Sequence, residues 1–171
     1  NGAGYAGLTT SSALGGSGGN YNTDGPGTLG FFDVSGGTGA YRLVVPEYFE
    51  YPGGSAMSFK SVLLGLAARS GAVLKIGANS AMTVAETLSV ANAATLDVGG
   101  GTTVSASTMT VAGGSTVLCR GVNTTAQVGG VWAGAGVTLV AGSLAVDATS
   151  RISADGQGYA GGAGGGNNGA G

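Results

Sequence analysis

The stretch GAVLKIGANSAMTVAETLSVANAATLDVGG, residues 71–100, decides the fold class. Pairs of apolar residues flank single polar or small residues in it, as in Leu74/Ile76 and Met82/Val84. Alternation with a period of two is typical of β-strands. Each apolar pair is shorter than an ordinary strand of about five to six residues. The stretch therefore predicts very short strands separated by glycine, asparagine, serine and alanine.

These pairs recur along the chain in three interleaved series. The first series is Leu74/Ile76, Leu96/Val98, Val117/Cys119 and Val137/Leu139. The second is Met82/Val84, Thr102/Val104, Val122/Thr124 and Leu144/Val146. The third is Leu88/Val90, Met109/Val111, the region 128–131 and Ile152/Ala154. One shared period of about 21 residues predicts an all-β fold, a parallel β-helix (β-solenoid) with three short strands in each rung and glycine-rich terminal segments.

Composition divides the chain of 171 residues into three segments. Residues 1–40 are a glycine-rich N-terminal segment, and residues 155–171 are a glycine-rich C-terminal segment. Residues 41–154 hold most of the large apolar side chains and are the predicted β-helix domain. The aromatic residues of its first part, 41–60, are expected to cap the N-terminal end of the coil.

Two interpretations compete for residues 55–71. The spacing of Phe59 and Val62 would suit one face of an amphipathic helix. Gly65 argues against that helix, because glycine is a poor helix former. The Val62/Leu64 pair also agrees with the 21-residue register, which places it on the second face and favours a strand.

Composition excludes several functions. The chain has six Lys and Arg residues, a net charge of −2, one cysteine and no histidine. So few cations cannot neutralise many phosphates, which argues against nucleic-acid binding. One Cys without His argues against a zinc site, and no cofactor is expected. The uncharged stretch 121–146 contains too many polar residues and glycines for a membrane span of about 20 apolar residues, so no membrane insertion is expected.

The two ends of the chain resemble each other. GAGYAG at residues 2–7 matches GQGYAG at residues 156–161 in five of six positions. This match predicts one period of a tandem array or a head-to-tail homopolymer. The residues expected at the junction are Gly4, Tyr5, Gly7, Gly158, Tyr159 and Gly161.

Other residues are candidates for binding or modification. An exposed aromatic platform for glycans would consist of Tyr41, Tyr48, Phe49 and Tyr51. Asn123 begins the sequon Asn-Thr-Thr on a predicted corner and is a candidate for N-glycosylation.

Three further residues could carry chemistry. Asp147 and Asp155 lie near Arg151 in sequence and are the best carboxylate pair for glycan cleavage. A solvated salt-bridge corner is the favoured interpretation of that cluster. Cys119 occupies an inward position and is expected to be a buried, inert thiol, with an intermolecular disulfide as the alternative.

Residues 71–100 and the segment RISADGQGYAGGAGGG at 151–166 resemble the glycine-rich β-helical repeats of large secreted or cell-surface proteins, of the autotransporter and giant-adhesin kind. In those repeats, short strands commonly end in an I-S-A-x-G-x-G-Y segment that precedes a glycine-rich stretch. Residues 41–58 depart from this pattern through their aromatics and prolines. The resemblance implies an extracellular or cell-surface location and a structural or adhesive role.

The leading hypothesis is a structural repeat subunit of an extracellular filament or surface appendage. It would assemble head to tail with copies of itself and would not be an enzyme. The alternative is an adhesin or carbohydrate-binding module, and a polysaccharide-cleaving enzyme is the third hypothesis.

Overall fold

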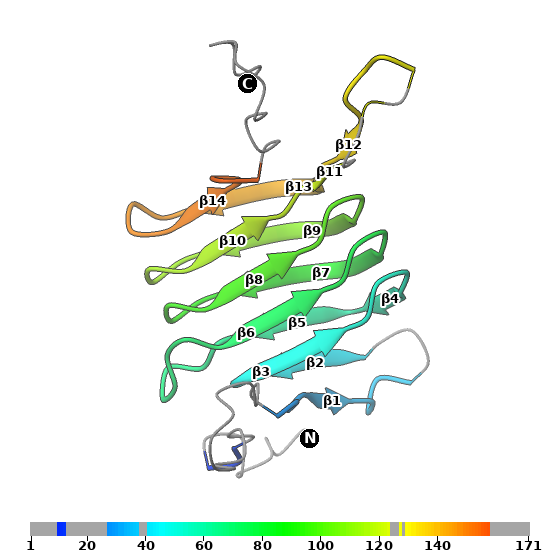
Figure 1. The fold of residues 1–171 in the computed structure, drawn as a ribbon. Coiled ribbons are helices and arrows are strands. Elements are labelled where there is room, and N and C mark those ends of the chain that lie inside the picture. The colour runs from blue at the N-terminus through cyan, green and yellow to red at the C-terminus, as the bar shows by residue number, and fades with distance from the viewer. Residues whose placement is uncertain (1–9, 13–26, 38–40, 124–126, 128, 158–171) are drawn as a thin grey trace, which may run out of the picture.

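The computed structural model describes residues 10–12, 27–37, 41–123, 127 and 129–157 (Figure 1). Within these ranges the protein is all-β, and most strands belong to two parallel sheets. The described residues contain no helix of the length and apolarity that a membrane span requires.

The first sheet has seven strands in the order β1-β2-β5-β7-β9-β13, with β4 also paired to β7. Its strands are β1 (Phe31–Asp33), β2 (Arg42–Val45), β4 (Ala56–Phe59), β5 (Ser61–Leu64), β7 (Ala81–Val90), β9 (Thr103–Val111) and β13 (Thr138–Val146). All of its pairs are parallel except β1 with β2.

The second sheet has five parallel strands in the order β14-β10-β8-β6-β3. They are β3 (Tyr48–Tyr51), β6 (Val73–Ile76), β8 (Thr95–Val98), β10 (Thr116–Cys119) and β14 (Arg151–Ser153). Each of the second-sheet strands β3, β6, β8 and β10 precedes one or two strands of the first sheet in the chain. We call a second-sheet strand together with these first-sheet strands a layer. Figure 1 shows the layers stacked in one direction, from β3 with β4 and β5 to β10 with β13.

A small third sheet interrupts the last layer. Its strands β11 (Val122–Asn123) and β12 (Gly134–Ala135) form an antiparallel pair. This hairpin projects beyond the last layer (Figure 1).

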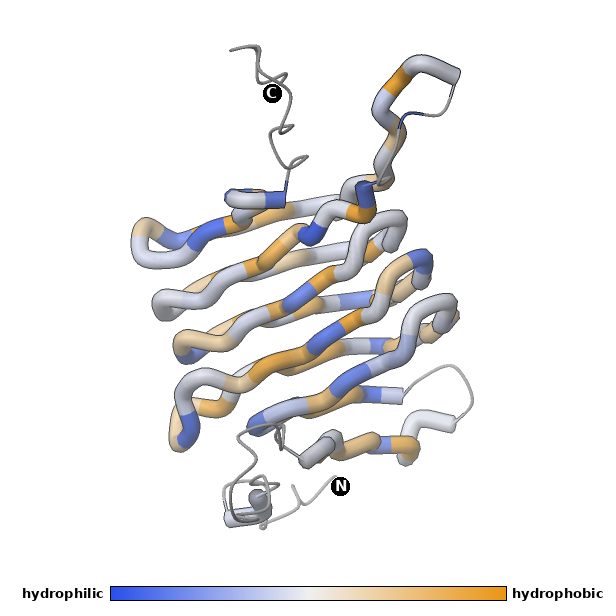
Figure 2. Tube along the Cα trace, in the orientation of Figure 1, coloured by the Kyte–Doolittle hydropathy of each residue, from blue (hydrophilic) through white to orange (hydrophobic). Residues whose placement is uncertain are grey.

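The core lies between the two parallel sheets. Leu74 pairs with Leu96, and Leu96 pairs with Val117, as the first series predicts. In the first sheet, Leu88 pairs with Met109. All these side chains are fully buried, and complete burial of one such side chain contributes roughly 1.5–3 kcal/mol. Figure 2 shows the hydrophobic segments recurring along the strands of both sheets.

The second and third predicted faces share one strand in most layers. Met82 and Val90 both belong to β7, and the equivalent faces are continuous in β9 and β13. The register of β7 against β9 shifts between Val84 and Thr87. Such an irregularity bends a strand without ending it. The expectation of three separate strands in each rung is therefore met only where β4 and β5 are distinct.

The last rung was predicted in the wrong register. Val117 pairs with Ile152 and not with Val137, and Cys119 is not beneath Leu139. The observed stacks of the last layer are Leu139 on Val104, Leu144 on Met109 and Ile152 on Val117.

The hairpin explains why the last layer departs from the predicted register. β10 ends at Cys119 and β13 begins at Thr138, so 18 residues lie between them, whereas four residues separate β8 from β9. The step from Val117 to its partner Ile152 is therefore 35 residues and not about 21. Val122, which was predicted to belong to the second series, lies in this hairpin.

Two other registers also differ from the prediction. Met82 pairs with Val104 and not with Thr102. Val62 pairs with Leu88, which places it in the third series and not on the second face. Residues 56–59 and 61–64 are strands, so the strand interpretation of this region is confirmed over the helix.

Aromatic rings cluster in the first layer, at the N-terminal end of the stack. Phe49 lies 5.0 Å from Tyr51 and 5.7 Å from Phe32, measured between ring centroids. Phe59 completes the cluster at 6.3 Å from Phe32. Phe32 belongs to β1, which adds an antiparallel strand to the edge of β2.

Buried hydroxyl groups connect neighbouring layers at one corner. The Ser80 hydroxyl accepts a hydrogen bond from the Ser55 N–H at 3.2 Å, and the Thr102 hydroxyl accepts one from the Ser80 N–H at 3.1 Å. The Thr102 hydroxyl in turn donates to the Gly77 carbonyl at 3.0 Å. The corners approach closely, because a Cβ on Gly77 would lie 2.3 Å from the Gly53 nitrogen.

Candidate functional site

The C-terminal end of the stack presents an uncovered part of the core. Leu144 and Ile152 occupy the same inward positions as their partners Met109 and Val117. The partners are 0% exposed, whereas Leu144 is 50% and Ile152 is 39% exposed. Among the described strands, β13 pairs only with β9. This end therefore offers both apolar side chains and the edge of a nine-residue strand.

The N-terminal end is different. There β1 runs antiparallel along the edge of β2, and Phe32 lies opposite Leu43. The Leu29 N–H donates to the Tyr48 carbonyl at 2.7 Å, which occupies part of the edge of β3. Phe32 is still 46% exposed, so this end also presents apolar surface.

The described part of the hairpin between β10 and β13 adds no residue to the buried core. No described residue from 120 to 136 belongs to the core cluster. Val131 is 66% exposed and Trp132 is 46% exposed. An insertion that exposes a tryptophan without extending the core is a candidate for function.

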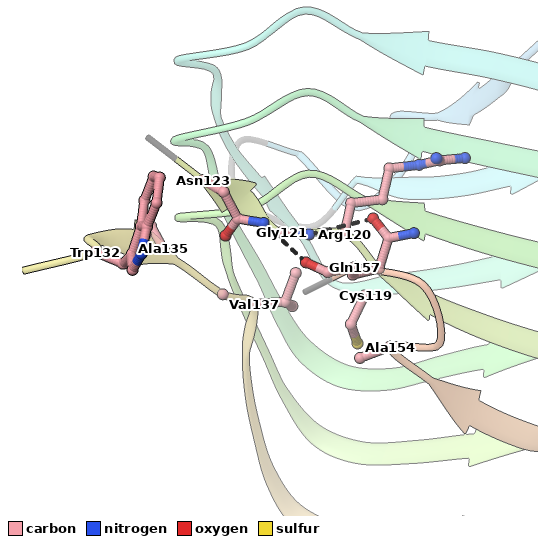
Figure 3. A pocket seen from close by; sticks show the side chains of 11 residues that line it. Cys119, Arg120, Gly121, Asn123, Trp132, Ala135, Val137, Ala154 and Gln157 are labelled. Carbon is pink, nitrogen blue, oxygen red and sulfur yellow. Dashed lines mark hydrogen bonds between the residues drawn. The ribbon is translucent and has the colours of Figure 1, made fainter. Parts of the chain in front are cut away.

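A pocket of about 500 Å³ lies between this hairpin and the last layer (Figure 3). Its described lining residues are Cys119, Arg120, Gly121, Asn123, Trp132, Gly134, Ala135, Gly136, Val137, Ala154 and Gln157. In Figure 3 Trp132 and Asn123 stand on the hairpin side, across from Cys119 and Ala154.

Gln157 connects the walls of the pocket. Its backbone carbonyl accepts a hydrogen bond from Asn123 Nδ2 at 3.1 Å. Its side-chain oxygen accepts one from the Gly121 N–H at 3.4 Å, and its Nε2 donates to the Asp155 carbonyl at 3.4 Å. The start of the hairpin is thereby joined to the turn that follows β14.

Arg120 is the one charged residue among the described residues that line the pocket, and it forms an ion pair with Asp97. Arg120 donates from Nε to Asp97 Oδ1 at 2.5 Å and from Nη2 to Asp97 Oδ2 at 2.7 Å. Asp97 lies in β8, one layer below, and is 7% exposed. The hydrogen bond to Asp97 raises the pKa of Arg120 above its ordinary value. The Asp97 carboxylate is covered by this ion pair.

Cys119 lines the pocket beside Ala154 (Figure 3). Its side chain is partly buried and packs against the core. Burial raises the pKa of the thiol above its ordinary value, because the thiolate would lose solvation. The neutral thiol therefore acts as a small apolar wall.

The four aromatic residues predicted as a platform do not share one exposed face. Tyr41, Phe49 and Tyr51 are partly buried and pack against the core. Tyr48 alternates with Phe49 along β3 and therefore lies on the opposite face of the strand. Its hydroxyl donates to Glu50 Oε2 at 2.5 Å.

The carboxylates proposed for catalysis have local contacts. Asp147 accepts hydrogen bonds from the Gly113 N–H at 2.7 Å and from the Thr149 N–H at 2.9 Å. Asp155 accepts one from the Ser153 hydroxyl at 2.8 Å. No salt bridge of Arg151 to either carboxylate is found in the described part of the chain. The described residues also contain no group of three or more Cys, Asp or Glu side chains placed to bind a metal.

The other predicted residues are placed as follows. Asn123 is exposed in β11, at the rim of the pocket. The residues predicted for the junction lie outside the described ranges, and they are Gly4, Tyr5, Gly7, Gly158, Tyr159 and Gly161. Comparison of the chain with protein-family models, with curated proteins and with solved structures finds no match.

Proposed function

We propose that the two facing parallel sheets are the walls of a parallel β-helix, and that the protein is a non-enzymatic structural unit that joins end to end with further copies. The observation that carries this proposal is the uncovered apolar ladder of the last layer. Leu144, Val146 and Ile152 are 50%, 40% and 39% exposed, although their partners in the layer below are fully buried.

The occupant that best suits this end is a second copy of the chain. Another layer would bury the exposed inward side chains and pair the free edge of β13, which is the way the lower layers are stabilised. The half-exposed Phe32 at the opposite end offers apolar surface for such a contact. A contact between different ends of identical subunits leaves both outer ends available and produces a filament.

The proposed location is extracellular, on a filament or cell-surface appendage. The support is the resemblance of residues 71–100 and 151–166 to secreted β-helical repeats. A carbohydrate-cleaving role has less support, because the Asp147 carboxylate already accepts the Gly113 and Thr149 N–H groups of its own corner.

Two matched double variants of β13 test the proposal. Leu144→Ser with Val146→Ser removes inward apolar groups, whereas Val140→Ser with Ala145→Ser changes outward positions of the same strand. Val140 is 51% exposed, so the control removes apolar surface of similar exposure. Sedimentation velocity over a range of protein concentrations and electron microscopy measure assembly, and circular dichroism checks folding.

The native chain is expected to form larger species as its concentration rises. The inward variant should remain monomeric and folded, and the outward variant should assemble like the native chain. A native chain that stays monomeric at every concentration would contradict the proposal, as would equal loss of assembly in both variants.

A further inference from the structure

We infer that the pocket between the hairpin and the last layer binds a neutral sugar unit of a glycan. The inference goes beyond the structural role and does not depend on it, because the pocket is built within one chain. It rests on the size of the pocket, on the chemistry of its walls and on the insertion that creates it.

The size and openness of the pocket suit one or two sugar rings of a longer chain. Its volume is about 500 Å³, and pockets that bind small molecules span roughly 300–1,000 Å³. It is partly open to solvent, so a polymer could continue beyond it.

The walls combine a flat apolar surface with hydrogen-bonding groups. Trp132 supplies an indole, which can pack against the C–H face of a sugar ring. Asn123 and Gln157 carry amides, which both donate and accept hydrogen bonds. Hydroxyl groups of a sugar can both donate to and accept from such a set.

The charge of the walls favours a neutral ligand. The described lining residues include no carboxylate, and Arg120 is their one charged residue. The two-point contact with Asp97 offsets that positive charge. An acidic glycan would therefore gain little attraction, and a cation would gain none.

The insertion itself supports a binding role. The described residues of the insertion expose Val131 and Trp132 and add nothing to the core. Without the hairpin, Trp132 would be absent and the pocket would have no outer wall. A structural role for the layer would be served by a four-residue connection, such as the one between β8 and β9.

Trp132 provides a selective signal, because it is the single tryptophan of the chain. We would titrate the native chain, at concentrations where it is monomeric, with maltotriose, cellotriose and triacetylchitotriose and with the acidic control trigalacturonate. Tryptophan fluorescence reports the pocket, and isothermal calorimetry gives the affinity independently of the indole.

The expected result is a saturable change in fluorescence and heat with at least one neutral trisaccharide. Trp132→Ala should weaken that binding at least tenfold by calorimetry, and Asn123→Ala should weaken it several-fold. Val131→Ala is the matched control, since Val131 is the exposed neighbour of Trp132 and does not line the pocket. Its affinity should equal that of the native chain, and circular dichroism should show that all three variants are folded.

Three results of the sugar titrations would overturn the inference. They are no saturable response to any neutral trisaccharide, a response to trigalacturonate alone, and unchanged affinity in both pocket variants. A fluorescence change that follows protein concentration without added sugar would show that a second copy covers Trp132. That outcome would also overturn the inference, while it would support end-to-end assembly.

Discussion

Leu144 stacks directly on Met109 between β13 and β9, yet half of Leu144 is exposed and none of Met109 is. The two residues hold the same inward position in successive layers. The difference between them is the presence of a covering layer, which Met109 has and Leu144 lacks. The contribution of a side chain to stability in this fold should therefore depend on the layer in which it lies.

Truncation of each of these two residues to alanine should show how the contribution of a side chain to stability depends on its layer. Met109→Ala should lower the free energy of unfolding by about 2–5 kcal/mol, the usual cost in a packed core. Leu144→Ala should cost less than half as much in the monomer, because much of its side chain is already in water. Urea unfolding at low protein concentration measures both values, and equal costs would contradict an uncovered end.

The hairpin should be removable without loss of the fold. Deletion of residues 122–135 removes β11 and β12 and leaves Arg120, Gly121, Gly136 and Val137 as a four-residue connection from β10 to β13. That length equals the connection between β8 and β9, so the layers should keep their register. We expect the thermal midpoint to stay within a few degrees of the native value and sugar binding to disappear.

A deletion that unfolds the protein would show that the hairpin is structural. The ion pair of Arg120 with Asp97 is kept in this variant, so its loss could not explain such a result.

The sequence was sufficient to predict the stacked positions of the second sheet from β6 to β10, but not every register of the first sheet and not the last layer. Leu74, Leu96 and Val117 stack as their spacing indicates, because short uniform connections keep the register of successive strands. The 21-residue spacing fails at Ile152, because strand pairing and not residue count decides the register and a loop of any length can join two strands. Val122 and the region 128–131 also fall close to the repeat spacing, so the insertion is not visible as a break in the pattern.

The sequence also could not predict the pocket, because residues that are far apart in the chain line it. Trp132 and Gln157 are 25 residues apart in sequence, and they line one pocket only because the hairpin returns the chain to the turn after β14. Trp132 was nevertheless a usable signal, since a single tryptophan in an uncharged glycine-rich stretch has no place in the repeating pattern.

The buried hydroxyl of Thr102 should stabilise the corner at which it contacts Ser80 and Gly77. Thr102→Val keeps the shape of the side chain but removes the acceptor for the Ser80 N–H. Thr102 is 0% exposed, so water cannot replace that acceptor. We expect a loss of about 1–3 kcal/mol in the free energy of unfolding. Thr103→Val is the control, because Thr103 is only partly buried, and its effect should be small or stabilising.

Ala93 adopts a backbone conformation that suits glycine. Its φ is 58°, in the left-handed region, where a side chain costs roughly 1–2 kcal/mol. Ala93→Gly should therefore raise the thermal midpoint, although the greater freedom of glycine in the unfolded chain offsets part of the gain. Ala94→Gly, at a fully buried neighbour, should lower it. A lower midpoint for Ala93→Gly would show that the freedom of glycine in the unfolded chain and the lost methyl contacts together outweigh the relief of strain.

Asp147 should make stability depend on pH in the acid range. Hydrogen bonds from the Gly113 N–H and then from the Ser150 and Thr149 side chains hold the pKa of Asp147 well below its ordinary value. The folded state therefore binds this proton less readily than the unfolded state. The stabilising contribution is complete above the ordinary pKa of an aspartate, about 4, and is lost as the pH falls through the folded pKa.

Thermal unfolding between pH 7 and pH 2 tests this linkage. Asp147→Asn should lower the midpoint at pH 7, and its difference from the native chain should shrink as the pH falls below about 4. Thr149→Val removes the hydroxyl that donates to Asp147 at 2.8 Å, so its pH dependence should lie between the two. A difference that stays constant across the range would mean that the Asp147 carboxylate acts at this corner through its shape and not through its charge.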